Sequence, residues 1–121
     1  RDLEGTTTFC NDGLILEIED DGVWQPIEAS SIISNPYNSP IVLGSDNVLE
    51  GQPAWCGAQD WTQSLVDFTA FSGPLRLRWH LATDRSVGRE GAYIDAIEIY
   101  ECNPQNLTYY LPVFAKDAVY R

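Results

Sequence analysis

Residues 75–81 alternate apolar and basic side chains one by one, and this pattern restricts the fold more than any other. The apolar positions are Leu75, Leu77, Trp79 and Leu81, and the basic positions are Arg76, Arg78 and His80. A period of two residues is typical of a β-strand with one buried face, because successive side chains of a strand point to opposite sides. The sequence therefore predicts a sheet that packs its apolar side on a core.

A second strand is predicted just downstream, over residues 92–102, after an acidic, glycine-bearing loop at 82–91. Tyr93, Asp95, Ile97 and Ile99 would share one face of this strand. Asp95 would then point the same way as two core isoleucines. Burial of a charge is costly unless something compensates it, so Asp95 is a candidate site residue.

The first half of the chain also alternates. Residues 14–19 predict a strand with one core face, and Asp20-Asp21-Gly22 is a strong hairpin turn that returns the chain over 23–28. Pro26 lacks an N–H, so the returning strand is expected to be an edge strand or to end early. Residues 44–60 predict a long ordered loop, held by the indole of Trp55 and, if Cys56 is bonded, by a disulfide.

The fold class follows from these strands. Residues 64–68 add a further strand, and no segment shows a sustained helical period. We expect an all-β domain of about seven strands over residues 1–102, most simply a two-sheet antiparallel sandwich. Residues 103–121 form a C-terminal extension with an apolar, strand-like tail at 108–114, in which Pro112 would interrupt a central ladder.

The charge of the chain limits its partners. Eighteen acidic and seven basic residues give a net charge of −11. Nucleic acid is not an expected partner, since phosphate binding requires a basic surface. Membrane insertion is not expected either, because no apolar run approaches the roughly 20 residues that a spanning helix needs. The acidity fits two interpretations, solubility outside the cell and binding of divalent cations by some of the carboxylates.

The three cysteines, Cys10, Cys56 and Cys102, form no Cys-x-x-Cys pair, which argues against a zinc knuckle or a thioredoxin-type site. We predict at least one disulfide, as in secreted proteins, and one odd thiol that pairs with another subunit or with sequence outside this chain. The alternative is three free, packed thiols. The absence of Met and the start at Arg1 are typical of a processed product or a fragment.

Several blocks carry a family resemblance: Trp61, 64–68 (SLVDF), 71–73 (FSG), 75–79 (LRLRW), 83–84 (TD), Gly88 and 91–97 (GAYIDAI), with 11–18 and 21–24 upstream. In order and spacing they resemble the MAM-like jelly-roll modules of secreted bacterial proteins. These are accessory domains in immune inhibitor A (M6-type) peptidases, in bacillopeptidase F-like proteins and in cell-surface proteins. The resemblance covers about residues 1–102 and implies a jelly-roll sandwich.

The resemblance also implies that this chain starts inside the fold, because such modules begin a few dozen residues earlier. A sandwich without its first strands exposes apolar faces and unpaired ladder groups, so it should aggregate or borrow a strand. The expected partners are therefore the missing N-terminal strands or other protein subunits. The tail at 109–114 is a segment that could be donated in such an exchange.

A structural Ca²⁺ is the cofactor that the resemblance suggests, with Asp95 as its first ligand and with Glu4, Asp12 and Asp84 as companions. Calcium takes six to eight oxygen ligands, which acidic loops can supply. Two features weaken this interpretation: Ala92 and Ala96 stand where the family has Trp and a second Asp. The alternative is that Asp95 caps N–H groups of the 82–91 loop or pairs with an arginine of that loop.

No catalytic set can be assembled around His80, the only histidine, which we place on an exposed or interfacial face. We therefore expect no enzyme. Trp79 and Trp61 are predicted core residues, whereas Trp55 is the exposed aromatic that could bind carbohydrate. Our first hypothesis is a non-catalytic extracellular or cell-surface module for adhesion, anchoring or assembly. The alternatives are a filament subunit joined by strand exchange and an accessory domain cut from a secreted metallopeptidase.

Overall fold

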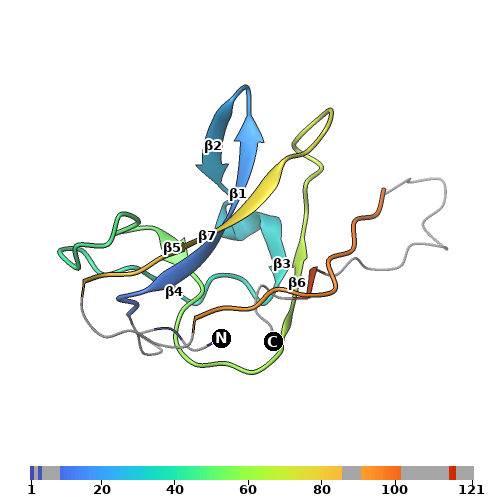
Figure 1. Cartoon of the computed structure of the whole chain (residues 1–121). Helices are drawn as coiled ribbons and strands as arrows, with labels where there is room; N and C mark the ends of the chain where they lie inside the picture. Colours follow the sequence, from blue (N-terminus) through green and yellow to red (C-terminus); the bar gives the residue numbers. More distant parts are fainter. Residues whose placement is uncertain (2, 4–8, 86–90, 102–114, 117–121) are drawn as a thin grey trace.

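The computed structural model describes residues 1, 3, 9–85, 91–101 and 115–116, and this part of the chain is all-β, with antiparallel sheets and no α-helix (Figure 1). Its elements are β1 (Gly13–Asp20), β2 (Val23–Pro26), the 3-10 helix η1 (Ala29–Ser31), β3 (Ile32–Ser34), β4 (Ser39–Pro40), β5 (Pro53–Ala54), β6 (Gln63–Val66), β7 (Leu77–Ala82) and β8 (Ala115–Lys116). None of the described segments is a helix long and apolar enough to span a membrane.

The central sheet has the order β2-β1-β7, and all its pairs are antiparallel. Asp21 and Gly22 form its hairpin turn with φ of 50° and 79°, as a two-residue turn with two left-handed positions requires. The predicted hairpin is confirmed. So is the prediction from Pro26: β2 lies at the edge of the sheet and ends at this residue. Figure 1 shows β7 running beside β1 on the side away from β2.

Strand β1 is buried on both faces over most of its length. One face packs into the main core, whose buried members are Leu3, Leu14, Leu16, Ile18, Ile27, Ile32 and Trp55. The other face contributes Ile15 to a second core with Cys10, Ile41, Ala54 and Cys56. The prediction of a single core face for this strand was therefore wrong.

Gly13 shows how tightly the second core packs against β1. A Cβ atom at this glycine would lie 2.7 Å from Cδ1 of Ile41 and 2.8 Å from Cβ of Ala54, closer than van der Waals contact. The chain on the far side of β1 therefore approaches the backbone of the strand directly.

Two smaller sheets complete the described structure. One has the order β3-β6-β8, and the other pairs β4 with β5. β8 belongs to the C-terminal extension, and its pairing with Gln63 and Ser64 of β6 joins this part of the extension to the domain. Leu14 and Trp55 form an isolated antiparallel bridge that connects β1 to the loop after β5.

The predicted alternation along β7 is confirmed in large part. Leu75, Leu77 and Trp79 pack against the main core, and Arg78 and His80 pair across from β1 on the opposite face. Leu81 differs, since its exposed fraction is 43 %.

The strand predicted over 92–102 does not form in its described part, residues 92–101. Ile97 is 48 % and Ile99 is 65 % exposed, and the side chain of Asp95 is exposed as well. The prediction that Asp95 points into a core with these isoleucines was therefore wrong. An alternating pattern buries one face only if a neighbouring strand supplies the ladder and the layer on which that face packs.

A disulfide between Cys10 and Cys56 confirms that the 44–60 loop is tied down. The bond joins residues 46 positions apart, and both cysteines lie in the second core. Cys102 lies outside the described residues.

Candidate functional site

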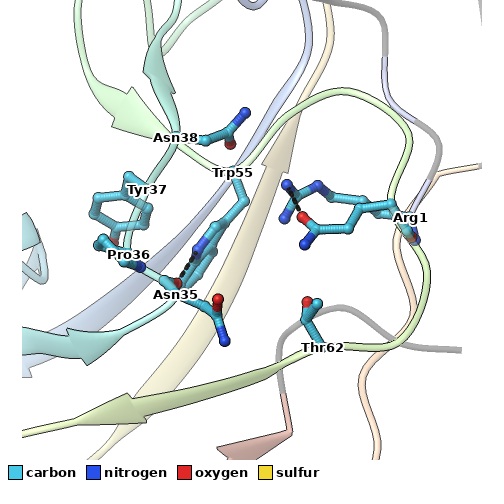
Figure 2. A pocket seen from close by; sticks show the side chains of 8 residues that line it. Arg1, Asn35, Pro36, Tyr37, Asn38, Trp55 and Thr62 are labelled. Atoms are coloured by element: carbon cyan, nitrogen blue, oxygen red, sulfur yellow. Dashed lines mark hydrogen bonds between the residues drawn. The ribbon is translucent and has the colours of Figure 1, made fainter. Parts of the chain in front are cut away.

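A pocket of about 270 Å³ opens beside Trp55, and polar side chains make up much of its lining (Figure 2). Its lining comes from the chain start, the 35–38 segment and the 55–62 loop: Arg1, Asn35, Pro36, Tyr37, Asn38, Trp55, Gln59 and Thr62. The lining offers a guanidinium group, three side-chain amides and the hydroxyl of Thr62 beside the aromatic rings of Tyr37 and Trp55. None of these described residues carries a carboxylate, imidazole or thiol side chain.

Hydrogen bonds fix one wall of this pocket. The Trp55 Nε1–H donates to the carbonyl oxygen of Asn35 at 2.9 Å, and the same oxygen accepts from Ser64 Oγ at 2.9 Å. Asn35 has φ of 48°, a left-handed conformation that asparagine tolerates better than most residues, and this turns its carbonyl toward the indole. Tyr37 packs edge-on against Trp55 with ring centroids 4.6 Å apart.

The opposite wall is formed by contacts to the disulfide loop. Asn38 Oδ1 accepts a hydrogen bond from the N–H of Cys56 at 2.8 Å. The Arg1 guanidinium donates to the carbonyl oxygen of Cys56 at 2.9 Å and to Oε1 of Gln59. The disulfide therefore fixes the segment against which both polar side chains are held.

The two tryptophans of this region exchange their predicted roles. Trp55 is only 3 % exposed and belongs to the main core, whereas Trp61 is 40 % exposed. The prediction that Trp55 is an exposed aromatic residue was therefore wrong, although the residue does line the pocket. The amides of Asn35, Asn38 and Gln59 were missed, because loop composition alone does not show which side chains converge.

The pKa of Tyr37, one of the residues that line the pocket, is shifted. Burial raises the pKa of Tyr37 to about 12, and the negative charge of Glu17 acts in the same direction. The hydroxyl lies 3.2 Å from the N–H and 3.3 Å from the carbonyl oxygen of Leu16, and the hydrogen bond with Leu16 opposes this rise in pKa.

We expect the Tyr37 pKa to destabilise the fold at alkaline pH. The unfolded chain releases this proton near pH 10 and the folded chain near pH 12. The stabilisation by neutral Tyr37 is therefore complete below pH 10 and is lost as the pH rises to 12, by about 2 kcal/mol. Urea unfolding at a series of pH values from 9 to 12 measures this change in the free energy of unfolding. The free energy of unfolding of Tyr37→Phe should fall less steeply with pH over this interval. An equal slope in the variant and the parent chain would contradict the assignment to Tyr37.

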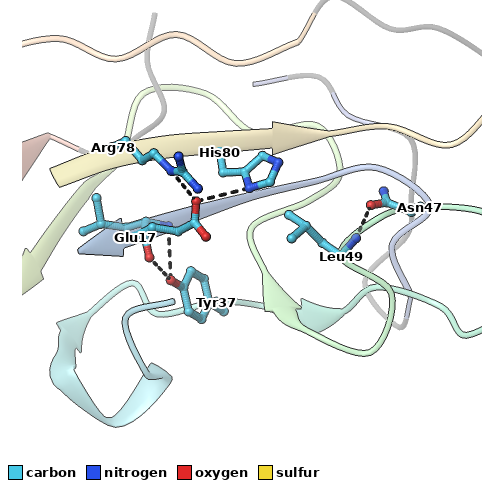
Figure 3. A network of polar contacts seen from close by, with 7 residues as sticks. Glu17, Tyr37, Asn47, Leu49, Arg78 and His80 are labelled. Atoms are coloured by element: carbon cyan, nitrogen blue, oxygen red, sulfur yellow. Dashed lines mark hydrogen bonds and ion pairs between the residues drawn. The ribbon is translucent and has the colours of Figure 1, made fainter. Parts of the chain in front are cut away.

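A second polar cluster, drawn in Figure 3, surrounds Glu17 of β1, on the same face of the strand as Ile15. Glu17 is only 6 % exposed, and its Oε1 accepts from Arg78 Nε at 2.7 Å and lies 3.2 Å from His80 Nδ1. The Arg78 guanidinium also lies 4.4 Å from the ring centroid of Trp24. The register places these residues on three adjacent strands, so the cluster ties β2 and β7 across β1.

The residues predicted to hold calcium are only partly brought together. Asp12 is 1 % exposed, and its Oδ1 accepts a hydrogen bond from the N–H of Asp84 at 3.0 Å. Asp95 is exposed and accepts from the N–H of Ala96 at 2.7 Å, while Glu4 lies outside the described residues. Among the residues that the structure describes, no group of three or more acidic, histidine or cysteine side chains could hold a metal ion. Asp12 therefore caps an N–H group of the 82–91 loop, a role that we considered as an alternative for Asp95.

Calcium binding stays a prediction. If an ion is bound through Asp12 and Asp84, chelation with EDTA should lower the melting temperature by several degrees, because a ligand of the native state stabilises it by mass action. Differential scanning calorimetry with EDTA, followed by calcium repletion, checks this. An unchanged melting curve contradicts the prediction, and magnesium repletion is the matched control.

Comparisons of the chain with protein-family models, with curated proteins and with solved structures find no match.

Proposed function

We propose that this chain is a non-catalytic extracellular binding module and that the Trp55 pocket takes a hydroxyl-rich ligand, a carbohydrate. The observation that carries the proposal is the composition of the pocket. In a chain with 18 acidic residues, the described residues of its lining carry no carboxylate but have amides, hydroxyls and one guanidinium group. Such groups donate to and accept from sugar hydroxyls, and aromatic rings pack on the apolar face of a sugar.

The extracellular part of the proposal is supported by the disulfide. Structural disulfides persist in oxidising surroundings and are rare where thiols are kept reduced. The bond between Cys10 and Cys56 holds the loop that forms one wall of the pocket. A strong negative charge favours solubility in the same setting. Adhesion or anchoring is then the role of a module that holds a glycan without changing it.

The test is binding of neutral and acidic oligosaccharides, first on an array and then by isothermal titration of the best ligand. Gln59→Ala and Thr62→Val should each weaken binding about ten-fold, the effect of losing one or two hydrogen bonds in a recess. Gln52→Ala is the matched control, because this glutamine is exposed and does not line the pocket. The proposal would be refuted if the chain bound no glycan, or if Gln59→Ala, Thr62→Val and the control Gln52→Ala bound the ligand equally well.

A second candidate function, a subunit of an assembly joined by strand exchange, is favoured by β8. This short strand of the C-terminal extension pairs with β6, and a strand at a chain end can form the same ladder with a neighbouring molecule. The exposed isoleucines at 97 and 99 add apolar surface for such contacts. The tail at 108–114 lies outside the described residues. Sedimentation velocity over a hundred-fold concentration range should then show oligomers, and a monomer throughout would remove this candidate.

A further inference from the structure

A second and larger recess, of about 660 Å³, lies between the 66–75 segment and residues 98–101. We name it the acidic groove. Its apolar walls are Val66, Phe68, Phe71, Leu75, Ile99 and Tyr100. None of these six residues is fully buried. Val66, Phe68, Phe71 and Leu75 are partly buried against the main core, whereas Ile99 and Tyr100 are exposed. The volume falls within the range of about 300–1,000 Å³ typical of ligand sites.

The apolar surface of the groove continues toward the core. A smaller cavity of about 30 Å³ shares Val66, Phe68 and Ile99 with the groove and reaches Leu77 and Trp79 of β7. An apolar side chain placed in the groove would therefore lie next to the main core. Such surface is favourable to cover, by roughly 25 cal/mol for each Å² removed from water.

The charges around the groove have one sign. Asp67, Glu98 and Glu101 line it and all three are exposed, and the described lining residues include no Lys, Arg or His. Two of them are held in place: Asp67 Oδ1 accepts from the N–H of Thr69 at 2.8 Å, and Glu98 Oε2 accepts from the Tyr100 hydroxyl at 2.5 Å. The bonds from Thr69 also lower the pKa of Asp67, so this carboxylate stays ionised at neutral pH.

From apolar walls and an acidic rim, we propose that the acidic groove binds a segment of a partner protein in which apolar residues alternate with lysine or arginine. The apolar side chains cover the walls, and the cations meet the three carboxylates. The aromatic faces of Phe68, Phe71 and Tyr100 attract cations as well. A second copy of the chain fits less well, because two molecules of net charge −11 repel each other.

The test uses a fluorescein-labelled peptide in which lysine alternates with leucine, titrated with the full chain by fluorescence anisotropy. Complementary charges should make binding salt-dependent, with affinity falling several-fold between 50 and 300 mM NaCl. The variant Asp67→Asn, Glu98→Gln, Glu101→Gln should bind about ten-fold more weakly, the effect of three exposed ion pairs. These amides keep the hydrogen-bond acceptors and remove the charge.

A matched control removes the same number of charges elsewhere: Glu28→Gln, Asp46→Asn, Asp60→Asn, all exposed and outside the groove. This variant should bind within two-fold of the parent chain. Ile99→Ser tests the apolar wall at a side chain that is 65 % exposed, and it should weaken binding about five-fold without loss of folding.

Three results would overturn the proposal. One is absence of peptide binding, and another is equal loss of affinity in both charge variants, which would show that only net charge matters. The third is a dimer that strengthens when the three groove carboxylates are neutralised, because the occupant would then be a second copy. A peptide with glutamate in place of lysine should not bind. None of these measurements depends on a carbohydrate ligand.

Discussion

Replacing Cys10 and Cys56 together by alanine is expected to lower the melting temperature by about 10–20 °C. The disulfide closes a loop of 46 residues, and the loss of chain entropy in the unfolded state that it enforces corresponds to about 4 kcal/mol. For a chain of 121 residues, each kcal/mol shifts the midpoint by roughly 3–5 °C. Calorimetry of the double variant measures the effect. Alanine is chosen because both positions are almost fully buried, where a serine hydroxyl would add a cost of its own.

Reduction provides the control for this prediction. The parent chain in a strong reductant should approach the melting temperature of the double variant, and the variant should not respond to the reductant. A midpoint within 2 °C of the parent would mean that the bond between Cys10 and Cys56 does not stabilise the fold. The loop over 44–60 forms one wall of the Trp55 pocket, so any glycan affinity should fall together with stability.

The elements that were predictable from sequence are those whose signal is local. The turn at Asp21-Gly22 needs only two residues that accept positive φ, and Pro26 limits β2 through its own missing N–H. The alternation over 75–81 likewise records which face of β7 meets the core. Each of these signals acts within a few residues, and none depends on a distant segment.

The features that could not be predicted depend on which segments, distant in the sequence, pack against each other in the fold. Ile15 was expected on the face of β1 that carries Glu17 and Glu19, yet Cys10, Ile41 and Cys56 bury it in a second core. Gly13 gave a signal in retrospect, because a residue without a side chain permits close approach of another layer. The prediction of a strand over the segment 92–101 was wrong for the opposite reason. Its alternation of side chains is clear, but no described strand pairs with it.

The two recesses also combine features that the sequence shows locally with features that depend on the packing of distant segments. The carboxylates of the acidic groove are visible as acidic residues in the sequence, but their convergence with Phe68 and Phe71 depends on the path of residues 98–101. The Trp55 pocket likewise joins segments from the start, the middle and the disulfide loop of the chain. Their described linings are opposite in charge, and this difference is the basis for proposing two different kinds of ligand for them.

Trp55→Ala is expected to destabilise the fold by about 3–5 kcal/mol, the cost of removing a large aromatic side chain from a core. The indole is 3 % exposed and packs with Leu14, Leu16 and Tyr37. It also donates a hydrogen bond to the carbonyl oxygen of Asn35. Urea unfolding followed by circular dichroism measures the change in the free energy of unfolding.

Two further tryptophan variants identify the cause of this loss. Trp61→Ala removes the same side chain six positions away at a site that is 40 % exposed, so it should cost less than half as much. Trp55→Phe keeps most of the buried area and should cost only about 1 kcal/mol, because the carbonyl of Asn35 still accepts from Ser64 Oγ. If Trp61→Ala proved as damaging as Trp55→Ala, burial of the indole would not be the cause of the difference expected here. A cost below about 1 kcal/mol for Trp55→Ala would instead favour the exposed, ligand-stacking role that the sequence alone predicted for Trp55.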